Sequence, residues 1–137
     1  MILVHIAFIG CSSYNRDWRN AGSTPVSLTS ADGRWEGTWI SEKNGHGGKL
    51  RCLMTPVTNL LYNARYRATY GGIFHFTYTA RLTLEPHDTG WEFNGQADLG
   101  KLAGGVYYYE GRATSNRLLS SYSSKYDNGQ FDLIRPK

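Results

Sequence analysis

The chain has 137 residues, 40% of them hydrophobic and 19% charged, which suits one compact domain and leaves no room for a second. Its 16 glycines and 14% aromatic residues indicate many short strands joined by tight turns, and they exclude a coiled coil or a disordered tail. The net charge is +4, but the basic residues are scattered along the chain without a cluster, so we expect no nucleic-acid partner.

The N-terminal stretch, residues 1–10, is apolar and ends at Gly10, directly before Cys11 and a run of polar residues. An apolar segment that ends at a small residue is typical of a signal peptide. Signal peptides begin with a positively charged region, however, and no Lys or Arg precedes Cys11 here. The alternative is an N-terminal strand packed on the domain, with Cys11 as an ordinary buried thiol. Both interpretations stay open on the residues alone.

The following segment, residues 11–32, is rich in Ser, Thr, Asn, Gly and Pro, as in a surface linker or tether. Trp18 is its one large aromatic side chain after Tyr14, and it either packs on the domain or is exposed. No segment of the chain has a convincing helical period. We therefore expect this part to be irregular.

From residue 33 to residue 137 the sequence alternates between apolar and polar side chains, which predicts half-buried strands. The expected strands cover residues 34–42, 48–55, 60–70, 74–84, 91–99, 105–114, 117–124 and 129–135. The connections between them are too short for a crossover helix, so consecutive strands must pair antiparallel. The prediction is an all-β fold: an eight-stranded antiparallel up-and-down (meander) barrel that closes on itself.

Aromatic side chains dominate the face that we expect to point into the barrel. Inward glycines at Gly37, Gly95 and Gly111 would let strands bend and make room for large rings. Such rings line small-molecule pockets, and they also fill the cores of narrow barrels. Ser120, Tyr122 and Ser124 indicate a more polar sector. The candidate ligand-binding residues of the lumen are Trp35, Trp39, Tyr66, Phe76, Tyr78, Phe93, Tyr107 and Tyr109.

Signals for catalysis or metal binding are weak. His46 lies in a glycine-rich turn and His75 on the polar side of a strand, without a second ligand at metal-binding spacing. Cys52 lies in an alternating strand, which predicts a buried, inert thiol. Four carboxylates come from different strands and do not form a recognisable pair: Glu36, Asp98, Glu110 and Asp132. We expect no enzyme activity, no catalytic residues, no metal and no cofactor.

The tripeptide Gly33-Arg34-Trp35, at the start of the first strand, resembles the G-x-W signature of the calycins, the lipocalin and avidin group. Gly37-Thr38-Trp39 repeats the pattern. The resemblance implies a calycin-like barrel over residues 33–136 that binds a small apolar or amphipathic ligand in its lumen. It also implies that the Trp closes the narrow end under a basic side chain, with Arg135, or alternatively Arg117, in that role.

Two further resemblances concern export. The segment Phe8-Ile9-Gly10-Cys11 resembles the lipobox of bacterial lipoproteins, which implies cleavage after Gly10 and lipidation of Cys11. The segments 33–51 and 104–136 are similar to small uncharacterised envelope lipoproteins of planctomycete-type bacteria, a group that brings no assigned activity. The resulting domain prediction is a signal peptide over 1–10, a linker over 11–32 and a barrel over 33–137.

Together these features predict an exported, lipid-anchored monomer of the bacterial envelope that binds a small amphipathic or apolar molecule without catalysis. The alternative is a structural or interaction protein of the envelope with a filled barrel. An open lumen of several hundred Å3 would favour the first. A filled core with an exposed aromatic patch would favour the second.

Overall fold

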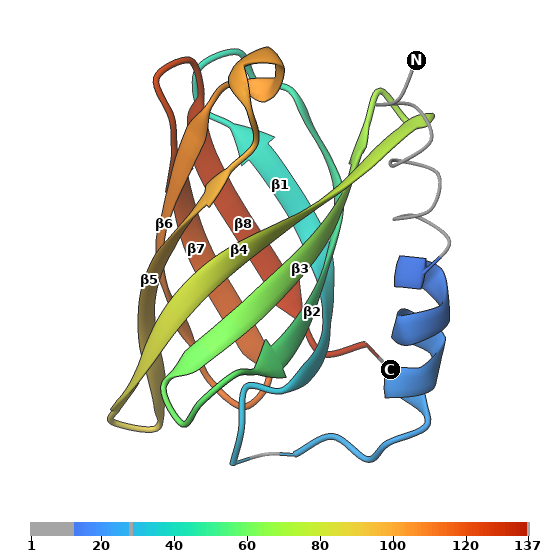
Figure 1. The fold of residues 1–137 in the computed structure, drawn as a ribbon, viewed down its shortest axis with the longest axis vertical. Helices are drawn as coiled ribbons and strands as arrows, with labels where there is room; N and C mark the ends of the chain where they lie inside the picture. The colour runs from blue at the N-terminus through green and yellow to red at the C-terminus, as the bar shows by residue number, and fades with distance from the viewer. Residues whose placement is uncertain (1–12, 28, 137) are drawn as a thin grey trace.

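The computed structural model describes residues 13–136 with the exception of residue 28. Within them, eight strands follow one another, and one short 3-10 helix, η1, lies between the fifth and the sixth (Figure 1). The elements are β1 (Gly33–Ser41), β2 (Gly47–Pro56), β3 (Leu61–Tyr70), β4 (Phe74–His87), β5 (Gly90–Asp98), η1 (Lys101–Ala103), β6 (Val106–Ala113), β7 (Arg117–Ser123) and β8 (Asn128–Ile134).

Every strand pairs antiparallel with the next one in the chain, and β1 pairs with β8 to close the sheet into a barrel. The closing pair runs from Glu36 opposite Ile134 to Ser41 opposite Gly129. The predicted all-β, eight-stranded, antiparallel meander barrel is therefore confirmed. Every strand thus has a paired neighbour on both sides, although the part of β4 before Arg81 pairs only with β3.

Alternation places one face of each strand inside the barrel. In β3 the buried side chains are Tyr62, Ala64, Tyr66 and Ala68, while the residues between them face outward. Strands β7 and β8 alternate in the same way between exposed and buried positions. Because side chains of a strand point to opposite faces at every second residue, the period of two in the sequence becomes the inside and outside of the barrel.

Glycines sit where neighbouring strands approach most closely. A Cβ atom at Gly37 would overlap the backbone carbonyl of Asp132, and one at Gly111 would overlap the carbonyl of Leu119. A side chain at either position would force the strands apart. These contacts explain why the predicted bending points carry glycine.

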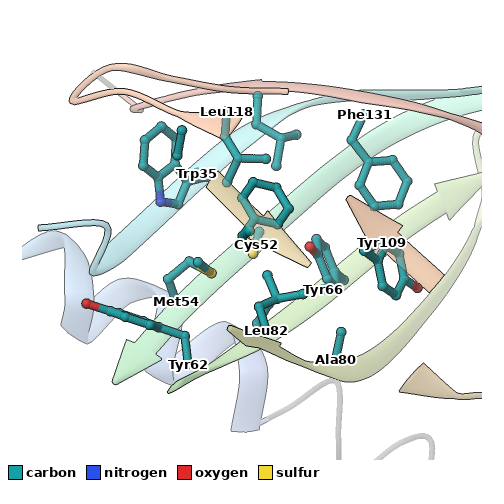
Figure 2. Packing of buried hydrophobic residues seen from close by; sticks show 14 of the residues in the cluster. Trp35, Cys52, Met54, Tyr62, Tyr66, Ala80, Leu82, Tyr109, Leu118 and Phe131 are labelled. Carbon is teal, nitrogen blue, oxygen red and sulfur yellow. The ribbon is translucent and has the colours of Figure 1, made fainter. Parts of the chain in front are cut away.

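One end of the barrel is closed by Trp35, whose indole nitrogen donates to the Ala31 carbonyl at 3.0 Å. The Arg135 guanidinium carbon lies 3.9 Å from the centroid of the Trp35 ring. Arg117 instead pairs with Asp132 on the outer surface, so it is Arg135 that covers the tryptophan. Figure 2 shows the core extending from Trp35 and Leu118 to Tyr66, Tyr109 and Phe131.

Residues 13–22 form a helix, so the expectation that no segment is helical is wrong for this part of the chain. Tyr14 and Trp18 are 1% and 6% exposed and pack with the outward-facing Leu53 of β2, with Ala21 beside them. The spacing of four and three residues places them on one helical face. The helix lies along the outside of the barrel, next to β2 and β3 (Figure 1).

Charged side chains of the barrel wall hold this helix. The guanidinium carbons of Arg34 and Arg51 lie 5.2 and 4.9 Å from the Trp18 ring centroid. Arg65 Nη1 lies 2.7 Å from Asp17 Oδ2, and this hydrogen bond lowers the pKa of the Asp17 carboxyl. Part of the outward arginine set is therefore covered by the helix and is not free surface charge. Among the described residues, no helix has the length and apolar character to cross a membrane.

Candidate functional site

The barrel contains a cavity of about 530 Å³ at the end opposite Trp35. This is the end that carries η1 and the turns between β1 and β2 and between β7 and β8 (Figure 1). Its lining is Trp39, Leu50, Ala68, Tyr70, Phe76, Tyr78, Leu99, Leu102, Tyr107, Tyr109, Tyr122, Asp127 and Phe131. The interior is thus neither wholly filled nor wholly open: one half is packed core and the other half is a cavity.

The eight predicted lumen residues divide between these two halves. Trp39, Phe76, Tyr78, Tyr107 and Tyr109 line the cavity. The other three, which do not line it, are buried in the core: Trp35, Tyr66 and Phe93. Since a strand rises about 3.3 Å per residue, side chains four positions apart on one face are separated by about 13 Å. Trp35 and Trp39 share a face of β1, but they lie at opposite ends of the barrel.

The floor of the cavity consists of Tyr78, Tyr109 and Phe131, whose rings pack on the buried ring of Tyr66. The Tyr66 ring is fully buried, and its centroid lies 5.1 Å from that of Tyr78, 5.8 Å from that of Tyr109 and 5.4 Å from that of Phe131. Burial is the main cause that raises the pKa of the Tyr78 and Tyr109 hydroxyls above 10. Both hydroxyls therefore stay protonated at neutral pH and offer uncharged polar groups beside an apolar floor.

A polar group lies at the mouth of the cavity, on the side of β7 and β8. The Ser41 hydroxyl donates to Asp127 Oδ1 at 2.6 Å, and the backbone N–H of Asn128 donates to the same oxygen at 2.9 Å. The Tyr122 hydroxyl donates to Asp127 Oδ2 at 3.2 Å. These three donors hold the carboxylate in place at the cavity rim.

Exposed apolar side chains also lie in η1 and in the β3–β4 turn. Leu102 of η1 is 96% exposed, and Ile73 and Phe74 at the β3–β4 turn are 73% and 64% exposed. Strand β4 extends beyond β5 here, because the pairing with β5 begins only at Arg81, whereas the pairing with β3 reaches back to Phe74. Leu102 lines the cavity, whereas Ile73 and Phe74 do not.

Several residues of the lining were not predicted as candidates from the sequence. Most of them occupy inward positions of the same alternating strands. Tyr70 ends the alternation of β3, and Phe131 occupies an inward position of β8. Tyr122 belongs to the sector predicted to be more polar, and Ser120 of that sector is buried. Asp127 lies in the turn between β7 and β8, where no local pattern distinguishes it from other turn aspartates. Leu102 lies between β5 and β6, where the sequence does not alternate and therefore does not predict which side chains point into the barrel.

The other candidate groups do not line the cavity, although His46 contacts Tyr70, which does. Cys52 is buried, and burial raises the pKa of its thiol well above 9, as expected for an inert side chain. His75 Nδ1 lies 3.0 Å from the Thr69 hydroxyl on the exposed side of the sheet. His46 Nδ1 lies 3.0 Å from the Tyr70 hydroxyl at an exposed turn.

The four carboxylates considered for acid–base chemistry do not line the cavity either. On the outer surface, Glu36 faces Arg51 and Asp132 faces Arg117. Asp98 accepts a hydrogen bond from the backbone N–H of Gly100. Glu110 is exposed. Within residues 13–27 and 29–136, His, Cys, Asp and Glu side chains form no group of three that would hold a metal ion.

The chain matches no family model, no curated protein and no solved structure. The calycin and envelope-lipoprotein resemblances therefore stay predictions from the sequence. What bears on function is the geometry of the barrel itself. The predicted lipidation site, Cys11, and the predicted signal peptide over 1–10 lie outside the described residues.

Proposed function

We propose that the protein binds a small amphipathic or apolar molecule in the cavity at the open end of the barrel, without catalysing its conversion. The observation that carries the proposal is the cavity of about 530 Å³, lined mostly by aromatic and aliphatic side chains. Ligand pockets commonly measure about 300–1,000 Å³ and combine apolar walls with a few polar groups that orient the ligand.

The chemistry of the lining supports an amphipathic ligand. Leu50, Ala68 and Phe131 offer apolar walls, while the hydroxyls of Tyr78 and Tyr109 lie near the floor. Tyrosine supplies a flat apolar surface together with a hydrogen-bonding group. A ligand with an apolar body and one or two polar groups would be satisfied by such walls.

Support for binding without catalysis comes from the placement of the reactive groups. The lining holds no histidine or cysteine, and Asp127 is its single carboxylate. Acid–base catalysis needs a general base together with a second group to act with it, such as a histidine or another carboxylate. The cavity offers hydroxyls and rings in place of such a pair.

The proposal is tested by titration with the neutral fluorescent probe phenylnaphthylamine, together with quenching of the tryptophan fluorescence that includes Trp39. We expect probe emission to rise on binding to the wild-type protein and to fall when a tighter ligand displaces it. Ala68→Trp places a large ring in the cavity, because Ala68 is buried and lines it, and should weaken probe binding at least about tenfold.

Thr79→Trp is the matched control, because Thr79 is an exposed position on the adjacent strand β4. It adds the same side chain outside the barrel and should leave probe binding unchanged. The proposal fails if the wild-type protein binds neither the probe nor a panel of apolar ligands. It also fails if Ala68→Trp folds and binds the probe as the wild-type protein does.

A second candidate function is interaction with an envelope partner through exposed apolar side chains of η1 and the β3–β4 turn. The exposure of Leu102, Ile73 and Phe74 favours it, since exposed apolar surface is where partners commonly bind. Under this alternative, cross-linking in cells would capture a partner with the wild-type protein that the double variant Leu102→Asp with Phe74→Asp no longer captures. Under the ligand-binding proposal alone, the double variant would give the cross-linking pattern of the wild-type protein.

We further propose that the protein is exported and anchored in the bacterial envelope by lipid at Cys11. The support is the segment Phe8-Ile9-Gly10-Cys11 followed by polar residues. Cys11→Ser should abolish membrane retention and the incorporation of labelled palmitate. Retention that is unaffected by this substitution would reject the anchor and leave the cavity proposal standing.

A further inference from the structure

The charge inside the cavity differs from the charge of the whole chain. The protein carries 15 lysines and arginines against 11 acidic residues. The residues that line the cavity nevertheless include no Lys, Arg or His, and the carboxylate of Asp127 is their single formal charge at neutral pH. A bound molecule would therefore meet a negative charge and no positive one.

The Asp127 carboxylate is held in place but not neutralised. Its Oδ1 accepts from Ser41 and from the backbone of Asn128, and its Oδ2 accepts from Tyr122. No ion pair among the described residues includes Asp127, and Lys125 Nζ lies instead 5.7 Å from the centroid of the Tyr126 ring. A carboxylate offers about four lone-pair positions, so these three donors leave capacity for a further donor.

Tyr122, which donates to this carboxylate, packs among other aromatic rings of the cavity lining. The Tyr122 ring stacks on Phe131 at a centroid distance of 5.1 Å and lies 6.1 Å from the Tyr107 ring. Trp39 lies opposite Phe131 in the pairing of β1 with β8. Faces of Trp, Tyr and Phe attract organic cations through their quadrupoles, and most strongly where water is excluded.

The hydroxyl next to the carboxylate stays a donor. Burial, and then the charge of Asp127, raise the pKa of Tyr122 above its usual value of 10. Tyr122 is therefore neutral at physiological pH and adds no second negative charge. The Tyr122 ring and the Asp127 carboxylate therefore lie side by side in the lining.

Resting on the proposed binding function, we infer that this cavity selects ligands whose polar head is an amine or a quaternary ammonium group. The head lies at the mouth beside Asp127 and the rings of Tyr107 and Tyr122, and the apolar tail extends toward the floor at Tyr78 and Tyr109. A ligand with a carboxylate head would face Asp127 with no cation to compensate its desolvation.

The test compares three ligands with the same decyl chain and different heads: decyltrimethylammonium, decanol and decanoate, each below its micelle concentration. Binding to the full chain is measured by displacement of phenylnaphthylamine and by calorimetry. We expect the cation to bind at least about tenfold more tightly than the alcohol, and decanoate to bind most weakly.

Asp127→Asn removes the charge while keeping the shape of the side chain. It should bring the affinity for the cation down to that for the alcohol and leave the affinity for the alcohol unchanged. Glu42→Gln is the matched control, because it removes one negative charge at the same end of the barrel. Glu42 accepts from the side chains of Asn128 and Gln130 and does not line the cavity.

Ligand binding and selectivity for a cationic head are tested separately by these experiments. If none of the three ligands binds, the proposed binding function itself is wrong. If decanol binds and the cation binds no more tightly, the selectivity is wrong while the binding function stands. Equal loss of cation affinity in Asp127→Asn and Glu42→Gln would also overturn the selectivity, because it would reflect net charge alone. Should Asp127→Asn not fold, the ratio of cation to alcohol affinity in the wild-type protein decides the question.

Discussion

Arg135 is the side chain whose removal tests the closed end of the barrel most directly. Its guanidinium covers Trp35 and donates to the backbone carbonyls of Ser30, Asp32 and Ser115. Hydrogen bonds from a charged donor contribute about 1.5–3 kcal/mol each, and a cation–π contact about 1 kcal/mol. These contributions are not additive and the side chain is half-buried, so we expect Arg135→Ala to lower the free energy of unfolding by about 3–4 kcal/mol.

The measurement is urea unfolding followed by tryptophan fluorescence and circular dichroism. Arg117→Ala is the matched control, because this arginine lies at the same end but forms an exposed ion pair with Asp132. Such surface pairs contribute little, so the control should unfold like the wild-type protein. Arg135→Lys should fall between the two, since an ammonium keeps the charge and loses the planar fork. A loss below about 1 kcal/mol for Arg135→Ala would refute this account of the closed end.

Three further predictions concern stability. Gly111→Ala should cost about 1–3 kcal/mol in urea unfolding, because the new methyl group would overlap the Leu119 carbonyl, and unchanged stability would mean that the strands are not held this close. Trp18→Ala should lower stability by about 3 kcal/mol and reduce the helical signal in circular dichroism; an exposed, unpacked helix would show neither change. Raising the pH above about 10 should destabilise the fold, since burial raises the pKa of several tyrosine hydroxyls, which therefore ionise first in the unfolded chain; each such group contributes about 1.4 kcal/mol per pH unit. They include Tyr14, Tyr66, Tyr78, Tyr109 and Tyr122. Their stabilising effect is complete below about pH 10, so urea midpoints that stay constant from about pH 9 to about pH 11 would contradict it.

The sequence predicted the barrel because its signals are local. Alternation such as that from Tyr62 to Ala68 states which side chains point inward, and the short connections leave antiparallel pairing as the only choice. The helix over 13–22 was not predicted, because only Tyr14 and Trp18 mark its apolar face and the residues around them favour turns. Its stability comes from packing on Leu53 of the barrel wall, which a local pattern does not contain.

The cavity was predicted less completely, for a related reason. Alternation gives the direction of a side chain but not its height along the barrel axis, so Trp35 and Trp39 were indistinguishable before the strands were placed in register. Asp127 stands out as a candidate site residue only in the structure, because Ser41 and Tyr122 both donate to it. Ser41 is distant in the chain, and Tyr122 belongs to the preceding strand β7. A contact of this kind depends on barrel closure between β1 and β8, a long-range event that no short motif encodes.

The length of β4 explains why one half of the interior stays open. Seven residues, from Phe74 to Ala80, pair with β3 but precede the pairing with β5, which starts at Arg81. The wall between this overhang and β6 is therefore made of side chains such as Leu99 and Leu102, which line the cavity. Side chains without a hydrogen-bonded ladder between them rearrange more easily than paired strands do. Ligand entry is thus expected between β4 and η1, where the exposed Leu102 lies beside the mouth, and not through the end closed by Trp35 and Arg135.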